Sequence, residues 1–213
     1  MRVPPWTRLV GLLLLPAASC VAPAYAPPPP EEPTQVYLLL EGEHTGIVLP
    51  DGPRRWVEYS YADWGWVVDG EDDTGYAMYS LMNPTRGALG RRSIEGPPML
   101  DPVYRRRGSS FQPFLAERTK VEALRAELDR EYGRDGADPF HNVGFDLHYV
   151  PAWRDYMLEY HCAHATMTWL DALGCRTKPD GILRSVKMKG VAELSAFEAQ
   201  SAAASDRLAG PEE

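Results

Sequence analysis

Cys162 is the residue with the clearest capacity for chemistry, because it directly precedes a segment with the apolar spacing of a helix. That spacing predicts a helix over residues 163–173, and Gly174 is a typical stop signal. A thiol at a helix start lies beside unpaired amide groups and the positive end of the helix dipole, both of which favour the thiolate. The thiolate is the reactive form, and the same amides can bind an oxyanion that develops on a substrate carbonyl. Cys162 is therefore a candidate nucleophile.

A structural disulfide with Cys175 is the ordinary interpretation of Cys162, since two cysteines in an oxidising compartment commonly pair. A helix over residues 163–173 would place their Cα atoms roughly 18–20 Å apart, at about 1.5 Å per residue. A disulfide requires Cα atoms within about 7 Å of each other. The helical spacing and Gly174 favour the helix over the disulfide, so we expect two thiols, with no chemical role for Cys175. An inert thiol buried in a core helix stays open as an alternative for Cys162.

A nucleophilic cysteine needs a base, which is usually histidine. The five candidates are His44, which opens a predicted strand, His141 and His148 in a loop-like stretch, and His161 and His164 beside the cysteine. A surface position or a hydrogen-bonded structural role is the ordinary interpretation of each. His161, Cys162, His164 and His44 could also hold zinc, but ligands one and two residues apart at a helix start do not converge on one ion. We expect no metal and no other cofactor.

The elements that would position these residues follow from hydrophobic patterning. Strands are expected over residues 35–40, 45–49 and 56–61, and helices over 76–83, 119–132 and 163–173. The second and third strands flank a proline- and glycine-containing turn at Pro50–Pro53, which predicts a hairpin. Residues 93–111 contain several prolines and no clear period. The expected fold class is α+β, a small antiparallel sheet packed by helices.

The N-terminal residues have the pattern of an export signal. Arg2 and Arg8 precede a short apolar run, and small residues follow before Cys20, which predicts a signal peptide over residues 1–19. Cys20 after small residues resembles a bacterial lipobox, with Ala17 at the usual leucine position. This resemblance implies a lipid on Cys20 and attachment to the membrane of the cell envelope. Plain secretion is the alternative.

The remaining chain divides by composition. Residues 20–34 are rich in proline and are expected to form an extended spacer. Residues 35–190 are expected to form the domain, and 191–213 an alanine- and serine-rich tail. With 44% hydrophobic residues the chain can build a core, and a formal net charge of −8 argues against nucleic acid as a partner.

Two motifs carry a resemblance to known proteins. The segment EHTGIVL at 43–49, with HCAHAT at 161–166, is similar to the circularly permuted NlpC/P60 branch of papain-like thiol enzymes. That branch includes lecithin retinol acyltransferase-like proteins and bacterial envelope hydrolases. The chain also resembles an uncharacterised family of bacterial envelope proteins with HTDIVLP and VEFGWGD strands, which correspond here to HTGIVLP at 44–50 and VEYSYAD at 57–63.

The resemblance implies a permuted papain-like fold with Cys162 as nucleophile and His44 as base. Glu58 or Asp63 would orient the imidazole, and His161 replaces the asparagine that precedes the family's nucleophile. The implied activity is that of an envelope hydrolase or acyltransferase acting on amide or ester bonds, of peptidoglycan peptides or lipid acyl groups.

The alternative is a non-catalytic envelope module that uses the same fold for binding or assembly. Trp64 and Trp66 would then form a contact patch if they are exposed, whereas in an ordinary fold such side chains belong to the core.

Overall fold

The computed structural model describes residues 21–42, 44–177 and 185–189, which form a mixed α and β fold. The strands are β1 Val21–Tyr25, β2 Pro33–Glu41, β3 His44–Pro50, β4 Arg55–Asp63, β5 Gly87–Glu95, β6 Ser110–Glu117, β7 Phe140–Asn142, β8 Leu147–Pro151, β9 Arg176–Thr177 and β10 Ser185–Lys189. The helices are α1 Thr74–Met82, α2 Pro102–Arg107, α3 Arg118–Tyr132 and α4 Cys162–Ala172, with a π-helix η2 at Gly65–Asp69 and a short 3₁₀ helix η3 at Pro98–Leu100. The α+β class expected from the sequence is confirmed.

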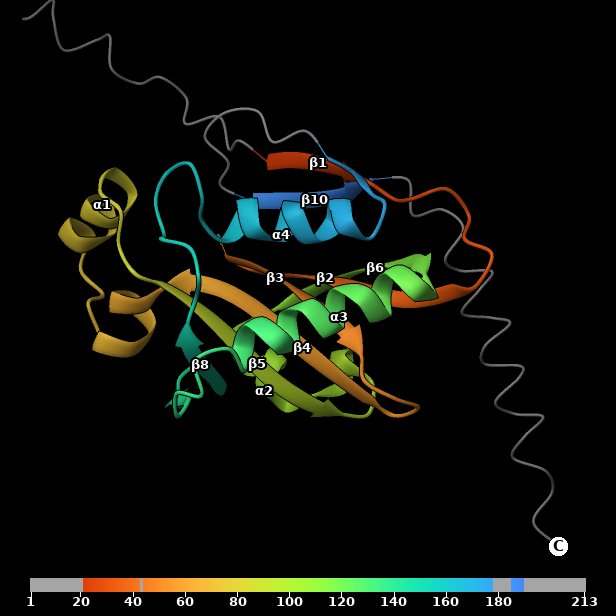
Figure 1. The fold of residues 1–213 in the computed structure, drawn as a ribbon, viewed down its shortest axis with the longest axis horizontal. Helices are drawn as coiled ribbons and strands as arrows, with labels where there is room; N and C mark the ends of the chain where they lie inside the picture. Colours follow the sequence, from red (N-terminus) through yellow and green to blue (C-terminus); the bar gives the residue numbers. More distant parts are fainter. Residues whose placement is uncertain (1–20, 43, 178–184, 190–213) are drawn as a thin grey trace, which may run out of the picture.

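The main sheet has seven strands in the order β6-β2-β3-β4-β5-β8-β7, and every neighbouring pair in it is antiparallel. Side chains alternate between its two faces. Ile47 and Tyr59 pack with α3 and α4 on one face, whereas Val48 packs with Tyr104 of α2 on the other. Figure 1 shows α3 and α4 on one side of the sheet and α2 on the opposite side.

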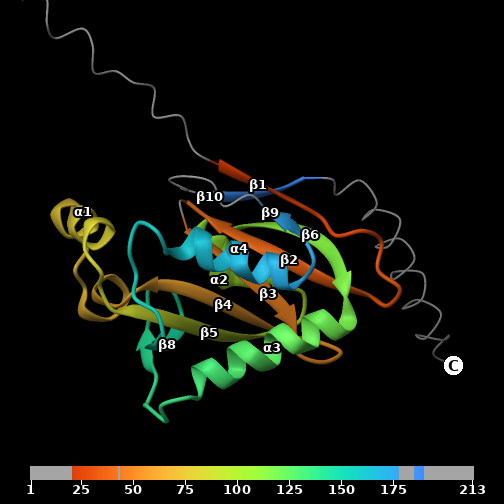
Figure 2. The same ribbon diagram turned by 45° about the horizontal axis from the view of Figure 1, so that its top comes forward.

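Helix α4 lies between the main sheet and a second sheet of three strands, ordered β10-β1-β9 (Figures 1 and 2). Most of its side chains are therefore buried, including Trp169 and Leu170. The hydroxyl of Thr45 on β3 lies 3.0 Å from that of Thr166 on α4, and both side chains are fully buried. This hydrogen bond joins the strand that begins at His44 to the helix that begins at Cys162.

Residues 21–25 are extended, as their composition predicts, but they are not a separate spacer. They form β1, which runs parallel to β10 and antiparallel to β9. Ala22 and Ala24 are buried in the main core. The expectation that the domain begins at residue 35 is therefore wrong, because this extended segment pairs with β9 and β10 from the far end of the chain and buries its small side chains in the core.

Residues 93–111, which have no clear period, hold the end of β5, η3, α2 and the start of β6. The prolines here begin η3 and α2, positions where a missing amide hydrogen costs nothing. The signal peptide, Cys20 and the tail over 191–213 lie outside the described residues. Within the described part of the chain, no helix combines the length and the apolar composition that crossing a bilayer requires.

The Thr45–Thr166 hydrogen bond gives a test of how β3 and α4 are held together. Thr45→Val removes the donor and leaves the Thr166 hydroxyl buried without it, so the free energy of unfolding should fall by about 1–2 kcal/mol. Thr45→Val with Thr166→Val should cost less than the sum of the single changes, because no hydroxyl is then stranded. Chemical denaturation measures both, with exposed Thr168→Val as the control. Strictly additive effects would contradict the coupling.

Candidate active site

Cys162 is the first residue of α4, and His161 caps the helix. The amide of Ala163 donates to Nδ1 of His161 at 3.3 Å, so Nδ1 carries no proton in this arrangement. The sulfur of Cys162 lies 4.0 Å from the same Nδ1. Both side chains are buried, and the ring of His164 packs edge-on against that of His161 with centroids 4.5 Å apart. The predicted position of Cys162 at a helix start is confirmed.

The prediction that Cys162 and Cys175 remain thiols is also confirmed. Cys175 follows α4, and burial raises the pKa of its thiol to about 12. A thiol with that pKa stays protonated at neutral pH and is a poor nucleophile. The two cysteines therefore occupy chemically different environments at opposite ends of one helix.

His44 is the first residue of β3 and is partly buried. Its Nε2 lies 2.7 Å from the hydroxyl of Ser60 on β4. Burial lowers the pKa of His44 to about 4, with Glu41 acting in the opposite direction and Arg107 in the same direction, so the ring is neutral at neutral pH. Strands β3 and β4 approach each other closely near His44. A Cβ on Gly46 would lie only 2.8 Å from the carbonyl oxygen of Tyr59.

Glu58 is completely buried two residues before Ser60 and points to the same face of β4. It accepts hydrogen bonds from the Tyr104 hydroxyl at 2.8 Å and from Arg107 at 3.0 Å. Burial raises the pKa of Glu58, while Arg107 opposes that effect. The group that contacts the His44 ring here is Ser60, so the orienting role predicted for Glu58 has a rival on the same strand.

Asp63 lies at the end of β4 and organises the segment that follows. It accepts hydrogen bonds from the amide of Trp66 at 2.8 Å and the hydroxyl of Tyr76 at 2.9 Å, and it also accepts from the hydroxyl of Thr85. These bonds tie η2, α1 and the segment just before β5 to the end of β4. Asp63 thus shapes the surroundings of the site, whereas its predicted contact with His44 stays a prediction.

A cavity of about 420 Å³ at this end of the sheet is lined by three of the four predicted site residues, Cys162, His44 and Asp63. Cys162 and Asp63 line it with Tyr156, and His44 lines it with Arg107. Its other walls are mainly apolar, formed by Glu41, Ala62, Trp66, Val67, Ala77, Ser80, Leu81, Phe145, Leu147 and Tyr149. Thr45 points to the face of the sheet that carries α4, so its neighbour His44 points to the opposite face. A cavity lined by both Cys162 and His44 therefore extends around the end of the sheet from one face to the other. Glu58, which is fully buried, is not among the residues that line it.

Tyr156 is a further residue of this cavity that the sequence did not single out. Burial raises its pKa, and the charge of Cys162 contributes in the same direction, so the phenol keeps its proton at neutral pH. It comes from the loop between β8 and α4, and its backbone pairs with that of Thr85 in an isolated antiparallel β-bridge. Ser60 and Arg107 were likewise not predicted. The alternation of residues along β4 could have indicated Ser60, but nothing local distinguishes Arg107 from its neighbouring arginines.

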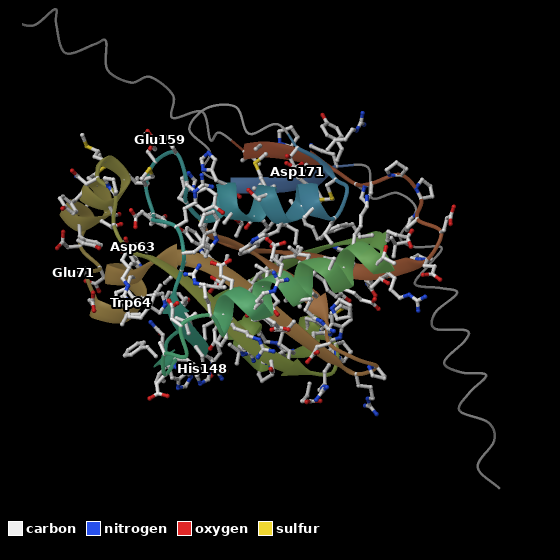
Figure 3. The ribbon with its side chains drawn as sticks, in the orientation of Figure 1. Asp63, Trp64, Glu71, His148, Glu159 and Asp171 are labelled. Carbon is white, nitrogen blue, oxygen red and sulfur yellow. The ribbon has the colours of Figure 1, made fainter. Side chains whose placement is uncertain are left out.

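The two tryptophans have different surroundings. Trp64 is partly buried and packs beneath the guanidinium of Arg86, 4.3 Å from the ring centre. Trp66 is 40% exposed and also lines the cavity. Figure 3 shows Asp63 and Trp64 at the same end of the molecule as Glu71 and Glu159.

Comparisons with protein families, with curated proteins and with solved structures give no match to this chain. Among the described residues, no group of three or more His, Cys, Asp or Glu side chains is arranged to hold a metal ion.

The low pKa of His44 predicts a specific pH dependence of stability. The unfolded chain, with a pKa near 6.5, binds the proton more tightly than the folded chain, with a pKa of about 4. The stability contributed by His44 is therefore complete above pH 6.5 and is lost as the pH falls toward 4, by up to about 3 kcal/mol. His44→Gln removes this titration and can still hydrogen-bond to Ser60.

Denaturation of both proteins between pH 7 and pH 4 measures this effect as the difference in their free energies of unfolding. The other titrating groups are common to both proteins and cancel in the difference. We expect the wild-type protein to lose its advantage over the variant as the pH falls. A difference that does not change with pH would contradict the neutral, buried state of His44.

Proposed function

We propose that this protein is a Cys–His hydrolase or acyltransferase of the bacterial cell envelope, with Cys162 as nucleophile and His44 as base. The observation that carries the proposal is that Cys162, at the N-terminus of α4, and His44, at the start of β3, line one cavity. The chain order of histidine strand, neighbouring strand and cysteine helix agrees with the resemblance to permuted NlpC/P60 enzymes. A permuted papain-like arrangement of the fold is part of this proposal.

The surroundings of Cys162 support a nucleophilic role. The first turn of α4 presents amide groups and the positive end of the dipole, which stabilise a thiolate and the oxyanion of a tetrahedral intermediate. The protonated hydroxyl of Tyr156 lies in the same cavity and can donate to that oxyanion. His44 is neutral at neutral pH and can therefore accept a proton.

The proposed reaction has two steps. In the first, the Cys162 sulfur attacks the carbonyl carbon of an amide or ester while His44 takes the thiol proton; the bond to the amine or alcohol then breaks, and His44 returns the proton to that leaving group. In the second step, water or another acceptor attacks the thioester, His44 takes the acceptor's proton, and the C–S bond breaks. The sulfur regains the proton, so the enzyme is restored.

The envelope location is proposed from the signal peptide and from Cys20, which would carry the lipid. Val21 is the first residue of β1, so a lipid on Cys20 would hold the domain directly against the membrane. Peptidoglycan peptides and lipid acyl groups are the substrates within reach of such a domain. No nucleic acid partner is proposed for a chain with a net charge of −8.

The second candidate is a non-catalytic envelope module, and one observation favours it. Trp66 on η2 and Met78 and Met82 on α1 leave large apolar side chains exposed, on the segment that also forms one wall of the cavity. Exposed apolar patches of this kind mark interaction sites. Such a surface would serve binding or assembly whether or not Cys162 reacts.

Thiol labelling tests the catalytic proposal. A chain with Cys20→Ser, exposed to a thiol-reactive probe near neutral pH, should be modified at Cys162 and spared at Cys175, whose pKa of about 12 keeps it protonated. His44→Ala should slow the modification of Cys162 at least tenfold, because the proton acceptor is gone. Peptide mapping by mass spectrometry measures both sites.

His141→Ala is the matched control, because His141 lies on β7 and is exposed outside the cavity. His161→Asn decides between the two imidazoles, since asparagine can still cap α4. Slower labelling in His161→Asn but not in His44→Ala would overturn the assignment of His44 as base. No labelling of Cys162 in the wild-type background would overturn the catalytic proposal.

The anchor has its own test. In a bacterial host, the full chain should fractionate with membranes and incorporate a labelled fatty acid. Cys20→Ser should abolish both, whereas Cys175→Ser should change neither, because Cys175 is buried. Release of the wild-type chain in soluble form would contradict lipidation at Cys20.

A further inference from the structure

Helix α1 exposes apolar side chains to an unusual extent. Six of its nine residues, TGYAMYSLM, are apolar or aromatic, yet its only buried residue is Ser80. Met82 is 76% exposed, Met78 56% and Tyr79 54%, and Trp66 on the preceding η2 is 40% exposed. An apolar helix normally buries its side chains against a neighbour. The opposite side of α1 lines the cavity through Ala77 and Leu81, so the exposed side is the outer surface of the cavity wall.

An acidic segment adjoins this apolar face. Asp69, Glu71, Asp72 and Asp73 connect η2 to α1, and all four are exposed. The sequence contains no lysine or arginine between Asp63 and Thr85. Asp73 is occupied as the N-cap of α1, accepting from the amide of Tyr76 at 2.9 Å, so the other three remain as surface charges.

A further acidic side chain comes from another part of the chain. Glu159 lies in the loop before α4, and Figure 3 shows it at the same end of the molecule as Glu71, with α1 between the two labels. The amide of Leu158, next to Glu159, donates to the carbonyl of Leu81 at 3.0 Å, which joins this loop to the end of α1. Acidic residues therefore lie near both ends of α1, the segment 69–72 before its start and Glu159 next to the residue that is hydrogen-bonded to Leu81 near its end.

We propose that the outer face of α1, with Trp66 and the acidic segment 69–72, is a docking surface for a basic amphipathic helix of a partner protein. Methionine and aromatic side chains adapt to an apolar helix face, and they are enriched in the cores of interfaces. The carboxylates beside them match lysine or arginine on the polar face of such a helix. This inference does not depend on any reaction at Cys162.

The same charges argue against a lipid surface as the occupant of this face. Helices that lie on membranes commonly carry basic residues on their polar face, which anionic lipids attract. Here the flanking residues are acidic, so an anionic bilayer would be repelled. Charge complementarity therefore selects a cationic polypeptide.

Isothermal titration calorimetry of the full chain, carrying Cys20→Ser, with a synthetic helix of leucine and lysine about 18 residues long, or about five turns, tests the proposal. We expect micromolar binding that weakens as salt is added, because screening reduces the charge attraction. A peptide with glutamate in place of every lysine should not bind. Met78→Gln/Tyr79→Gln/Met82→Gln, which keeps good helix formers in α1, should weaken binding at least tenfold.

Charge variants separate local recognition from the overall negative charge. Asp69→Asn/Glu71→Gln/Asp72→Asn should weaken binding about tenfold at low salt. The matched control neutralises three exposed acids elsewhere, Glu122→Gln/Glu127→Gln/Asp138→Asn, and should bind like the unmodified chain. Met99→Gln/Leu100→Gln, at an exposed apolar pair on η3, is the control for lost apolar surface.

Three calorimetric results would overturn the proposal. They are no binding of the basic helix, equal binding by the α1 variant and its η3 control, and equal weakening by both sets of charge changes. Vesicles of phosphatidylcholine with phosphatidylglycerol provide the remaining comparison. Vesicle binding that is lost in the α1 variant would assign this face to the membrane and would also overturn the proposal.

Discussion

An ionisable carboxyl group in the middle of a sheet requires a partner, and Arg107 is the partner of Glu58. The Arg107 side chain is 4% exposed and the Glu58 side chain 0%, so water cannot replace either one as the partner of the other. The guanidinium also binds Glu41 at the end of β2 and donates to the carbonyl of Phe145. One buried cation thereby joins α2, two strands and the loop before β8. Removing one member of such a group strands a buried charge, which costs far more than an exposed ion pair contributes.

The candidate site depends on this arrangement because His44 follows Glu41 closely in the chain. The position of Glu41 fixes where β3 begins, and Ser60 holds the His44 ring from the neighbouring strand. From the other face, the packing of α4 between two sheets fixes its first turn and therefore Cys162. The hydrogen bond between Thr45 and Thr166 connects these two supports. The cavity lies where β3 and α4 begin, at the end of the sheet that α1 and η2 cover.

Several features were predictable because they depend on neighbouring residues alone. The apolar period over residues 163–173 and Gly174 gave α4 to within one residue at each end, and with it the position of Cys162 at a helix start. The hairpin of β3 and β4 followed from the Pro50–Pro53 turn and the alternation that flanks it. Strands β5 and β6 were not predicted, because glycines, arginines and a proline within them hide the usual pattern. Their strand conformation depends on pairing with β4 and β2 across long sequence separations.

The sequence by itself determined the α+β class, the placement of Cys162 and His44 at the starts of a helix and a strand, and the separation of the two thiols. Local periodicity and turn residues are enough for these features, since they act over a few residues. Only the tertiary structure decided that residues 21–25 belong to the fold, that Ser60 contacts His44 and that Arg107 neutralises Glu58. It also decided that α1 leaves its apolar side chains uncovered. Each of these depends on burial and pairing between segments far apart in the chain, which no local pattern records.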